Sequence, residues 1–194
     1  EEGNIIEKAD RNLIEQNIKL FNNKIFEIAN NIPADKSDTD KEKLIYDYLQ
    51  DTVKYDENAA EVASLQSDSY NAFGAVCEGL AVCEGYSEAF QYLCYSVGIN
   101  STIVIGRGEN QDHEWNAVCL DSEWYMVDAT WDDSGTDDLN CYNYFNVTED
   151  YMEKTGHIIF TDTHNVPSCT SDKYAFYNIY GMRMVSHSEP PANY

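Results

Sequence analysis

Apolar residues recur every three or four positions over the first part of the chain, which is the spacing of a helix that buries one face. Between residues 5 and 32 this stripe includes Ile6, Leu13, Phe21 and Ile25. It predicts one long amphipathic helix.

A second helix is predicted to begin after a polar break at residues 33–38. Thr39 and Glu42 have the spacing of a capping box, in which both side chains bond backbone N–H groups at the start of a helix. The inward stripe of this helix is Leu44, Ile45, Tyr48, Leu49 and Val53. Residues 54–74 are rich in Asp, Ser and Asn, which predicts a loop or short turns.

The helical period returns at residues 83–97 and then gives way to strand-like runs. Gly98 supplies the expected end of this third helix. Short β-branched and alternating runs predict strands at residues 101–106, 113–120 and 123–130, of which the last two form a hairpin.

This hairpin has a predicted register because a turn at 121–122 contains only two residues. Such a turn pairs Cys119 with Trp124. It leaves His113 one diagonal step from Asp128, on the same face of the sheet.

The remaining pattern indicates one domain. An aromatic run at 174–184 predicts a further strand, and residues 186–194 predict a tail or linker. We therefore expect a single domain at residues 1–185, with N-terminal helices at 1–54 and a core at about 70–160.

The charge of the chain narrows the classes of function. Its 194 residues contain 12 Lys plus Arg against 35 Asp plus Glu, which gives a formal net charge of −23. Nucleic acids and anionic membranes repel such a chain, so neither is an expected partner. No apolar run is long enough to span a membrane.

The cysteines and histidines do not indicate a metal or cofactor site. None of the six cysteines forms a C-x-x-C pair, and the histidines other than His113 are scattered along the chain. We therefore expect no metal and no cofactor. The even number of cysteines permits up to three disulfides in an oxidising compartment, and the count alone does not decide between disulfides and free thiols.

Three residues have the types and positions of a nucleophilic site. Cys83 lies at the predicted start of a helix, where the helix dipole and an adjacent imidazolium both favour the thiolate. His113 begins one predicted strand and Asp128 ends its neighbour. A carboxylate there can hold the imidazole in one tautomer, so we predict a nucleophile, a base and an orienting group.

Each of these residues also has a plainer interpretation. A lone cysteine is usually a small buried hydrophobe, and His113 has polar neighbours typical of a surface histidine. Asp128 lies in an apolar strand, where a carboxylate is costly unless it is paired. Cys77 has similar neighbours to Cys83 but no sustained helix after it, so we favour Cys83. Glutamates beside Cys83 would raise its pKa if they faced it, and we expect them to point to solvent.

Four sequence runs in this order carry a family resemblance. They are Ala-Val-Cys-Glu-Gly-Tyr-Ser-Glu-Ala-Phe-Gln-Tyr-Leu at 81–93, Gly-Ile at 98–99, His-Glu-Trp-Asn-Ala-Val at 113–118 and Trp-Tyr-Met-Val-Asp-Ala-Thr-Trp-Asp-Asp at 124–133. Together they resemble the core of the bacterial transglutaminase-like superfamily. Tyr144-Phe145-Asn146 and the later His157 resemble its usual continuation. A second cysteine at Cys77 departs from the family pattern, which leaves a disulfide or a regulatory thiol open.

The resemblance implies a papain-like α+β fold, in which a helix bearing the nucleophilic cysteine packs on an antiparallel sheet. By position, Cys83 is the implied nucleophile, His113 the general base and acid, and Asp128 the orienting residue. The implied function is a cysteine protease, amidase or transglutaminase-type acyl transferase acting on peptide or protein amides. The alternative is a non-catalytic module that kept the fold and binds a peptide or partner.

Several expectations depend on weaker signals. The oxyanion donor is expected to include the backbone N–H of Cys83 and a side chain such as Tyr55 or Tyr70. The acidic run at 132–138 lacks the spacing of a calcium loop, so a solvated acidic loop is favoured. The negative charge favours cationic substrates, including cell-wall peptides. We expect the protein at the cell surface or outside the cell, with the cytoplasm as the alternative.

Overall fold

The computed structural model describes residues 2–62, 67–109, 111–133, 141–160 and 166–181. The predicted tail at 186–194 lies outside these ranges. The helices and strands in chain order are α1 (Glu2–Asn31), α2 (Asp38–Thr52), β1 (Lys54–Tyr55), α3 (Glu57–Val62), η1 (Asp68–Tyr70), η2 (Gly74–Glu78), β2 (Leu80–Ala81), α4 (Cys83–Ser96), β3 (Asn100–Gly108), β4 (Gln111–Leu120), β5 (Glu123–Val127), α5 (Ala129–Asp132), α6 (Glu149–Lys154), β6 (His157–Ile159) and α7 (Phe176–Tyr180).

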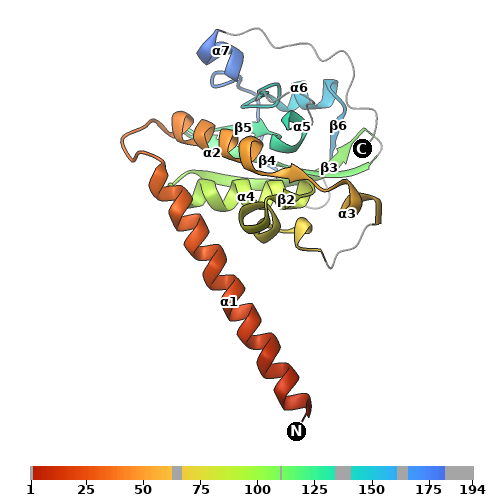
Figure 1. Cartoon of the computed structure of the whole chain (residues 1–194). Coiled ribbons are helices and arrows are strands. Elements are labelled where there is room, and N and C mark those ends of the chain that lie inside the picture. Colours follow the sequence, from red (N-terminus) through yellow and green to blue (C-terminus); the bar gives the residue numbers. More distant parts are fainter. Residues whose placement is uncertain (1, 63–66, 110, 134–140, 161–165, 182–194) are drawn as a thin grey trace.

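An antiparallel sheet of four strands in the order β5-β4-β3-β6 lies against helix α4 (Figure 1). The predicted hairpin register is confirmed, because Cys119 pairs with Trp124 across β4 and β5. Asp121 and Ser122 have φ of 49° and 67°, as a two-residue turn that matches the twist of the strands requires. The predicted α+β class is therefore confirmed, with a helix that begins at Cys83 packed on an antiparallel sheet.

Strand β4 separates two hydrophobic clusters because its side chains alternate between the faces of the sheet. Val118 and Leu120 join the larger cluster, to which α2 contributes Ile45 and α4 contributes Phe90 among others. Trp115 and Ala117 join the smaller cluster on the other face. His113 shares the parity of Trp115, so the sheet directs these two side chains to one face.

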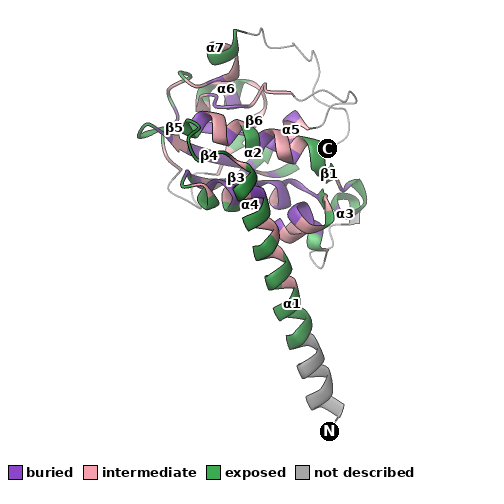
Figure 2. Ribbon diagram, turned by 60° about the vertical axis from the view of Figure 1, so that its left-hand side comes forward, coloured by how far each residue is buried: buried purple, intermediate pink, exposed green. Residues whose placement is uncertain are grey.

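Helix α1 confirms the long N-terminal helix but buries only part of its apolar stripe. Near its C-terminal end, Ile28 is buried and Phe21 packs edge-on against Tyr92 of α4, with ring centroids 5.2 Å apart. Farther toward the N-terminus the helix extends away from the body of the fold (Figure 2), and Leu13 and Ile18 are exposed. Within the described residues, no helix combines the length and hydropathy needed to cross a membrane.

The predicted capping box of α2 is wrong. Ser37 caps this helix, because its hydroxyl accepts a hydrogen bond from the backbone N–H of Asp40 at 3.1 Å. Thr39 and Glu42 follow Ser37 by two and five residues, inside the helix, and are both buried. Glu42 instead accepts a hydrogen bond from the side-chain amide of Asn146 at 2.8 Å.

Three other predicted segments also differ. The expected loop at 54–74 contains β1, α3 and η1. The expected strand at 123–130 ends at Val127, because Asp128 caps the short helix α5. Residues 176–180 form helix α7 rather than a strand, and residues 182–184 of that prediction lie outside the described ranges.

A short parallel ladder joins β1 to β2. Tyr55 pairs with Ala81, and the N–H of Asp56 donates to the carbonyl of Ala81 at 2.9 Å. This ladder holds Tyr55 close to the residue that begins α4, Cys83.

Candidate active site

Cys83 is the first residue of α4, so the positive end of the helix dipole lies at its backbone. The thiol itself is largely buried, with 7% of the residue exposed. Its Sγ lies 3.1 Å from Oε2 of Glu84. Burial and the charge of Glu84 raise the pKa of Cys83 well above its usual value, against a smaller lowering by the N–H of Glu114.

This arrangement contradicts the expectation that Glu84 points to solvent. A carboxylate accepts hydrogen bonds only, so the Cys83 thiol must donate to Glu84. The described conformation therefore contains a neutral thiol rather than a thiolate.

His113 and Asp128 form the pair that the hairpin register predicts. Nε2 of His113 lies 2.7 Å from Oδ2 of Asp128, and both residues are buried. Because an ionised carboxylate only accepts, Nε2 must carry the hydrogen of this bond. A neutral His113 is then left with an unprotonated Nδ1, the form that can accept a proton.

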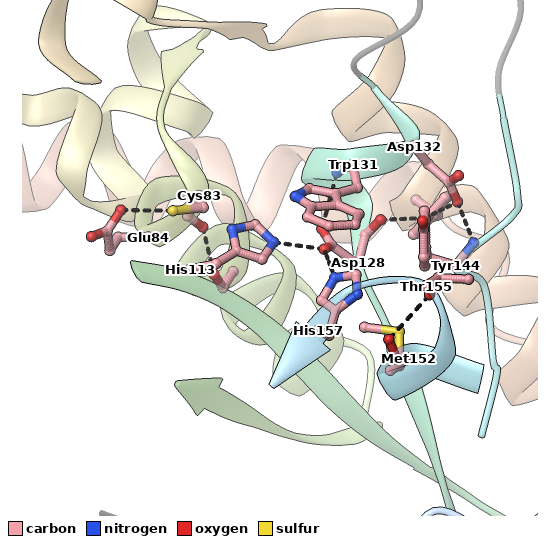
Figure 3. A network of polar contacts seen from close by, with 12 residues as sticks. Cys83, Glu84, His113, Asp128, Trp131, Asp132, Tyr144, Met152, Thr155 and His157 are labelled. Atoms are coloured by element: carbon pink, nitrogen blue, oxygen red, sulfur yellow. Dashed lines mark hydrogen bonds and ion pairs between the residues drawn. The ribbon is translucent and has the colours of Figure 1, made fainter. Parts of the chain in front are cut away.

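Figure 3 shows Nδ1 of His113 on the side of the ring toward Cys83, opposite the bond to Asp128. Cys83 and His113 also line one small pocket of about 20 Å³, which is enough for a water molecule or a small group. The structure thus brings all three predicted site residues together. The residues around the pocket are Tyr55, Cys83, Gly108, Gln111, Asp112, His113, Thr130 and Trp131.

Aromatic rings hold the imidazole of His113 in place. The ring stacks on Trp131 at 5.4 Å and on Trp115 at 5.7 Å between centroids, with interplanar angles of 28° and 25°. Asp128, the partner of this imidazole, is itself buried, and a buried setting strengthens the electrostatic interaction between the two.

Asp128 is buried, and both of its carboxylate oxygens accept hydrogen bonds. Its Oδ1 accepts the backbone N–H of Trp131 at 3.0 Å, which is the cap of α5. Its Oδ2 accepts from His113 and also from Nε2 of His157 at 2.9 Å. Burial alone would raise the pKa of Asp128, but the charge and hydrogen bond of His113 and the hydrogen bond of His157 lower it well below its usual value.

His157 is the site residue whose role the sequence reasoning missed. It lies on the short edge strand β6, outside the predicted hairpin, and only the family resemblance drew attention to it. The apolar run Ile158-Ile159-Phe160 after it was the available signal for a strand.

Within the part of the chain that the structure describes, the two histidines and Asp128 are also a group that could hold a metal, since one ligand atom of each lies within 4.8 Å of the others. Their geometry is that of hydrogen bonds. Ligands on a tetrahedral zinc lie about 3.3 Å apart, because each bond is about 2.0–2.1 Å long. The observed separations of 2.7 and 2.9 Å are shorter.

The transglutaminase-like superfamily model matches residues 27–129, which is more than half of the chain and contains Cys83, His113 and Asp128. The chain belongs to the transglutaminase-like superfamily. Members of this superfamily are generally enzymes, and cysteine proteases and transglutaminases are among them. His157 lies beyond the matched residues.

Similar proteins agree with this membership. The kyphoscoliosis peptidase of Mus musculus is 23% identical over 82% of this chain and 25% of its own length. The protein of the same name from Homo sapiens is 24% identical over 66% of this chain and 21% of its length. The chain therefore spans about a quarter of these relatives. A crystal structure of a TGase superposes with a TM-score of 0.50 at 20% identity, covering 69% of this chain and 39% of the other, which supports the fold.

Cys77, the departure from the superfamily pattern, does not form a disulfide. Cys77 lies within the described residues and is a free thiol. Burial and the charge of Glu78 raise the pKa of Cys77.

Acidic side chains continue from the site into the surrounding structure. Burial and the charge of Glu84 raise the pKa of Glu114 to about 8. Burial also raises the pKa of Asp132 and Asp133 to about 7. These two aspartates accept hydrogen bonds from Tyr46 and Tyr86, so the expectation of a solvated acidic loop is wrong for them. Residues 134–138 lie outside the described ranges.

Proposed function

We propose that this domain is a cysteine-dependent hydrolase or acyl transferase that acts on amide bonds of peptides or proteins. The observation that supports this most directly is the state of His113. Its Nε2 is bound to a buried carboxylate while its Nδ1 lies on the side of Cys83, in a pocket that both residues line.

The proposed reaction begins when the Cys83 thiol leaves Glu84 and gives its proton to Nδ1 of His113. A rotation about the Cα–Cβ bond of Cys83 between staggered positions can make this exchange. Sγ then attacks the amide carbon, and His113 returns the proton to the leaving amine. The product is a thioester on Cys83, which water hydrolyses or a second amine cleaves, and the thiol is restored.

The oxyanion of the tetrahedral intermediate needs donors near Cys83. The N–H of Cys83 is one candidate, because the first N–H groups of a helix have no partner within it. Tyr55 is the second candidate, because it lines the same pocket. Tyr70 is less suitable, since its hydroxyl donates to the carbonyl of Ala59 at 2.9 Å.

The test measures the alkylation of each cysteine by iodoacetamide between pH 5 and 9, read by peptide mass spectrometry. Wild-type protein is compared with His113→Ala and with Cys83→Ser. We expect Cys83 to react faster at pH 7 than the other five cysteines, and to lose this advantage without His113. Hydrolysis of a quenched fluorescent peptide library and incorporation of a fluorescent primary amine then separate water from amine as the acceptor.

A non-catalytic binding module is the second candidate, and a specific observation favours it. The Cys83 thiol is buried, bound to Glu84 and has a raised pKa, as an unreactive cysteine would be. If Cys83 reacts no faster than Cys77 and His113→Ala changes nothing, the binding function becomes the better proposal.

We also propose that substrates with a cationic side chain near the scissile amide are preferred. Asp112 lines the pocket, and the Glu84 carboxylate adjoins Cys83. Peptides with Lys beside the amide should be processed faster than matched peptides with Glu, and the difference should shrink in high salt. Equal rates at low salt would contradict this preference.

A further inference from the structure

A single carboxylate oxygen of Asp128 accepts hydrogen bonds from two histidines. Nε2 of His113 and Nε2 of His157 lie 2.7 and 2.9 Å from Oδ2, while the N–H of Trp131 occupies Oδ1 (Figure 3). Because the carboxylate only accepts, His157 must also carry its hydrogen on Nε2. A neutral histidine has one N–H, so this bond determines the tautomer of His157.

His157 lies behind the pocket, where it bonds Asp128 and its ring also faces His113 at 5.6 Å between centroids. It is fully buried and is not among the residues that line the pocket. Its ring packs on Trp131 with centroids 4.0 Å apart. Strand β6 holds its backbone, since His157 pairs with Gly108 of β3.

The environment keeps His157 as a neutral donor. Burial lowers the pKa of His157, and the neighbouring carboxylate opposes this only in part. His157 therefore gives Asp128 a hydrogen bond that does not depend on a transferred proton. His113, in contrast, must gain and lose a proton in the proposed reaction.

We propose that His157 is a positioning residue, which fixes the Asp128 carboxylate in its ionised form. The carboxylate in turn holds His113 in the Nε2–H tautomer, whose unprotonated Nδ1 lies on the side of Cys83. This inference rests on the proposed function, but it assigns a role outside the three residues of that proposal. Without His157, one lone pair of a buried carboxylate loses its donor. Asp128 can then rotate away from His113 or take up a proton.

The experiment uses two replacements of His157 with opposite hydrogen-bonding properties. His157→Phe keeps a planar ring but has no donor, and His157→Gln keeps a donor. We expect His157→Phe to slow the His113-dependent alkylation of Cys83 at pH 7 by about tenfold, because hydrogen bonds to charged groups are strong. His157→Gln should recover most of this rate.

A double-mutant cycle separates a role through Asp128 from a packing role. Asp128→Asn keeps the cap of α5, since asparagine also caps helices. If His157 acts through Asp128, the variant Asp128→Asn with His157→Phe should alkylate no more slowly than Asp128→Asn alone. Tyr144→Phe is the matched control, because it keeps the ring that packs 5.3 Å from His157 and removes only a hydroxyl that bonds Thr155. It should leave the rate within about twofold.

The outcomes distinguish the two proposals. If His113→Ala leaves Cys83 reactivity unchanged in the wild-type background, the proposed function fails. If that dependence is present but folded His157→Phe reacts like the wild type, or the double variant shows the product of both losses, the role of His157 is overturned.

A measurement on the unaltered protein applies even if His157→Phe does not fold. Long-range ¹H–¹⁵N NMR spectra report the tautomer of each histidine. The proposal requires the Nε2–H form at His157, and an Nδ1–H form would refute it.

Discussion

Removing the charge of Glu84 should make Cys83 more reactive. In the structure, Glu84 accepts the thiol hydrogen at 3.1 Å and is among the causes of the raised pKa of Cys83. The change Glu84→Gln keeps the size of the side chain and removes the negative charge. The thiolate is no longer opposed by that carboxylate, so the pKa of Cys83 should fall.

The magnitude follows from Coulomb's law. At this distance two unit charges interact with roughly 1 to 5 kcal/mol for dielectric constants between 80 and 20. Glu84 is only partly buried, so the lower end applies, which lowers the pKa by about one to two units. The thiolate fraction then rises about 10- to 100-fold at neutral pH. A less basic thiolate is also a weaker nucleophile, with a Brønsted coefficient of about 0.4–0.5, so the net gain is about 3- to 15-fold.

The assay follows the reaction of Cys83 with a small neutral disulfide at pH 7, resolved by peptide mass spectrometry. Cys77 in the same sample is the internal reference. Glu78→Gln is the matched control, because Glu78 raises the pKa of Cys77. Glu78→Gln should raise the reaction rate of Cys77 and leave the reaction rate of Cys83 unchanged. An unchanged or slower reaction of Cys83 in folded Glu84→Gln would refute the reasoning.

Three further predictions concern stability, each measured by urea unfolding. Burial raises the pKa of Glu42 to about 8, so the folded state binds an extra proton between about pH 4.5 and 8 and stability falls as pH rises through this window. Glu42→Gln should remove this pH dependence and raise the free energy of unfolding by about 3 kcal/mol at pH 7 but by little at pH 4. An equal gain at both pH values would contradict the explanation from a buried acid. Ser37→Ala should cost about 1 kcal/mol because it removes the cap of α2, and no loss would restore Thr39 as the cap. Gly106→Ala should cost about 2 kcal/mol or more, since its Cβ would lie 2.1 Å from the carbonyl oxygen of Ile158; wild-type stability would show that β6 moves away freely.

The parts of the structure that were predicted from the sequence depend on local patterns. Helix α4 shows the period of its apolar residues and ends at Ser96, two residues before Gly98, whose φ is 85°. The register of β4 and β5 follows from a turn of two residues, so the approach of His113 to Asp128 was available without a structure.

The missed features depend on contacts between distant segments or on the orientation of one side chain. His157 reaches Asp128 because β6 joins the edge of β3, a pairing across about fifty residues that no short pattern encodes. Glu42 has the spacing of a surface cap, yet the packing of Asn146 against α2 buries it. Glu84 lies beside Cys83 in the sequence, but its rotamer decides whether it faces solvent or the thiol.

The parallel ladder between β1 and β2 has a consequence for how the length of this chain can vary. It pairs Tyr55, which lines the pocket, with Ala81, which lies two residues before Cys83. The segment between them begins and ends at this ladder, so extra residues beside the exposed Glu61, at the C-terminal end of α3, would lengthen the segment without moving the pocket. A single residue deleted between Ala81 and Cys83 would instead shift the nucleophile relative to Tyr55. The segment between β1 and β2 can therefore accept inserted residues, for instance a grafted recognition loop. The ladder itself and its spacing to Cys83 cannot change in length.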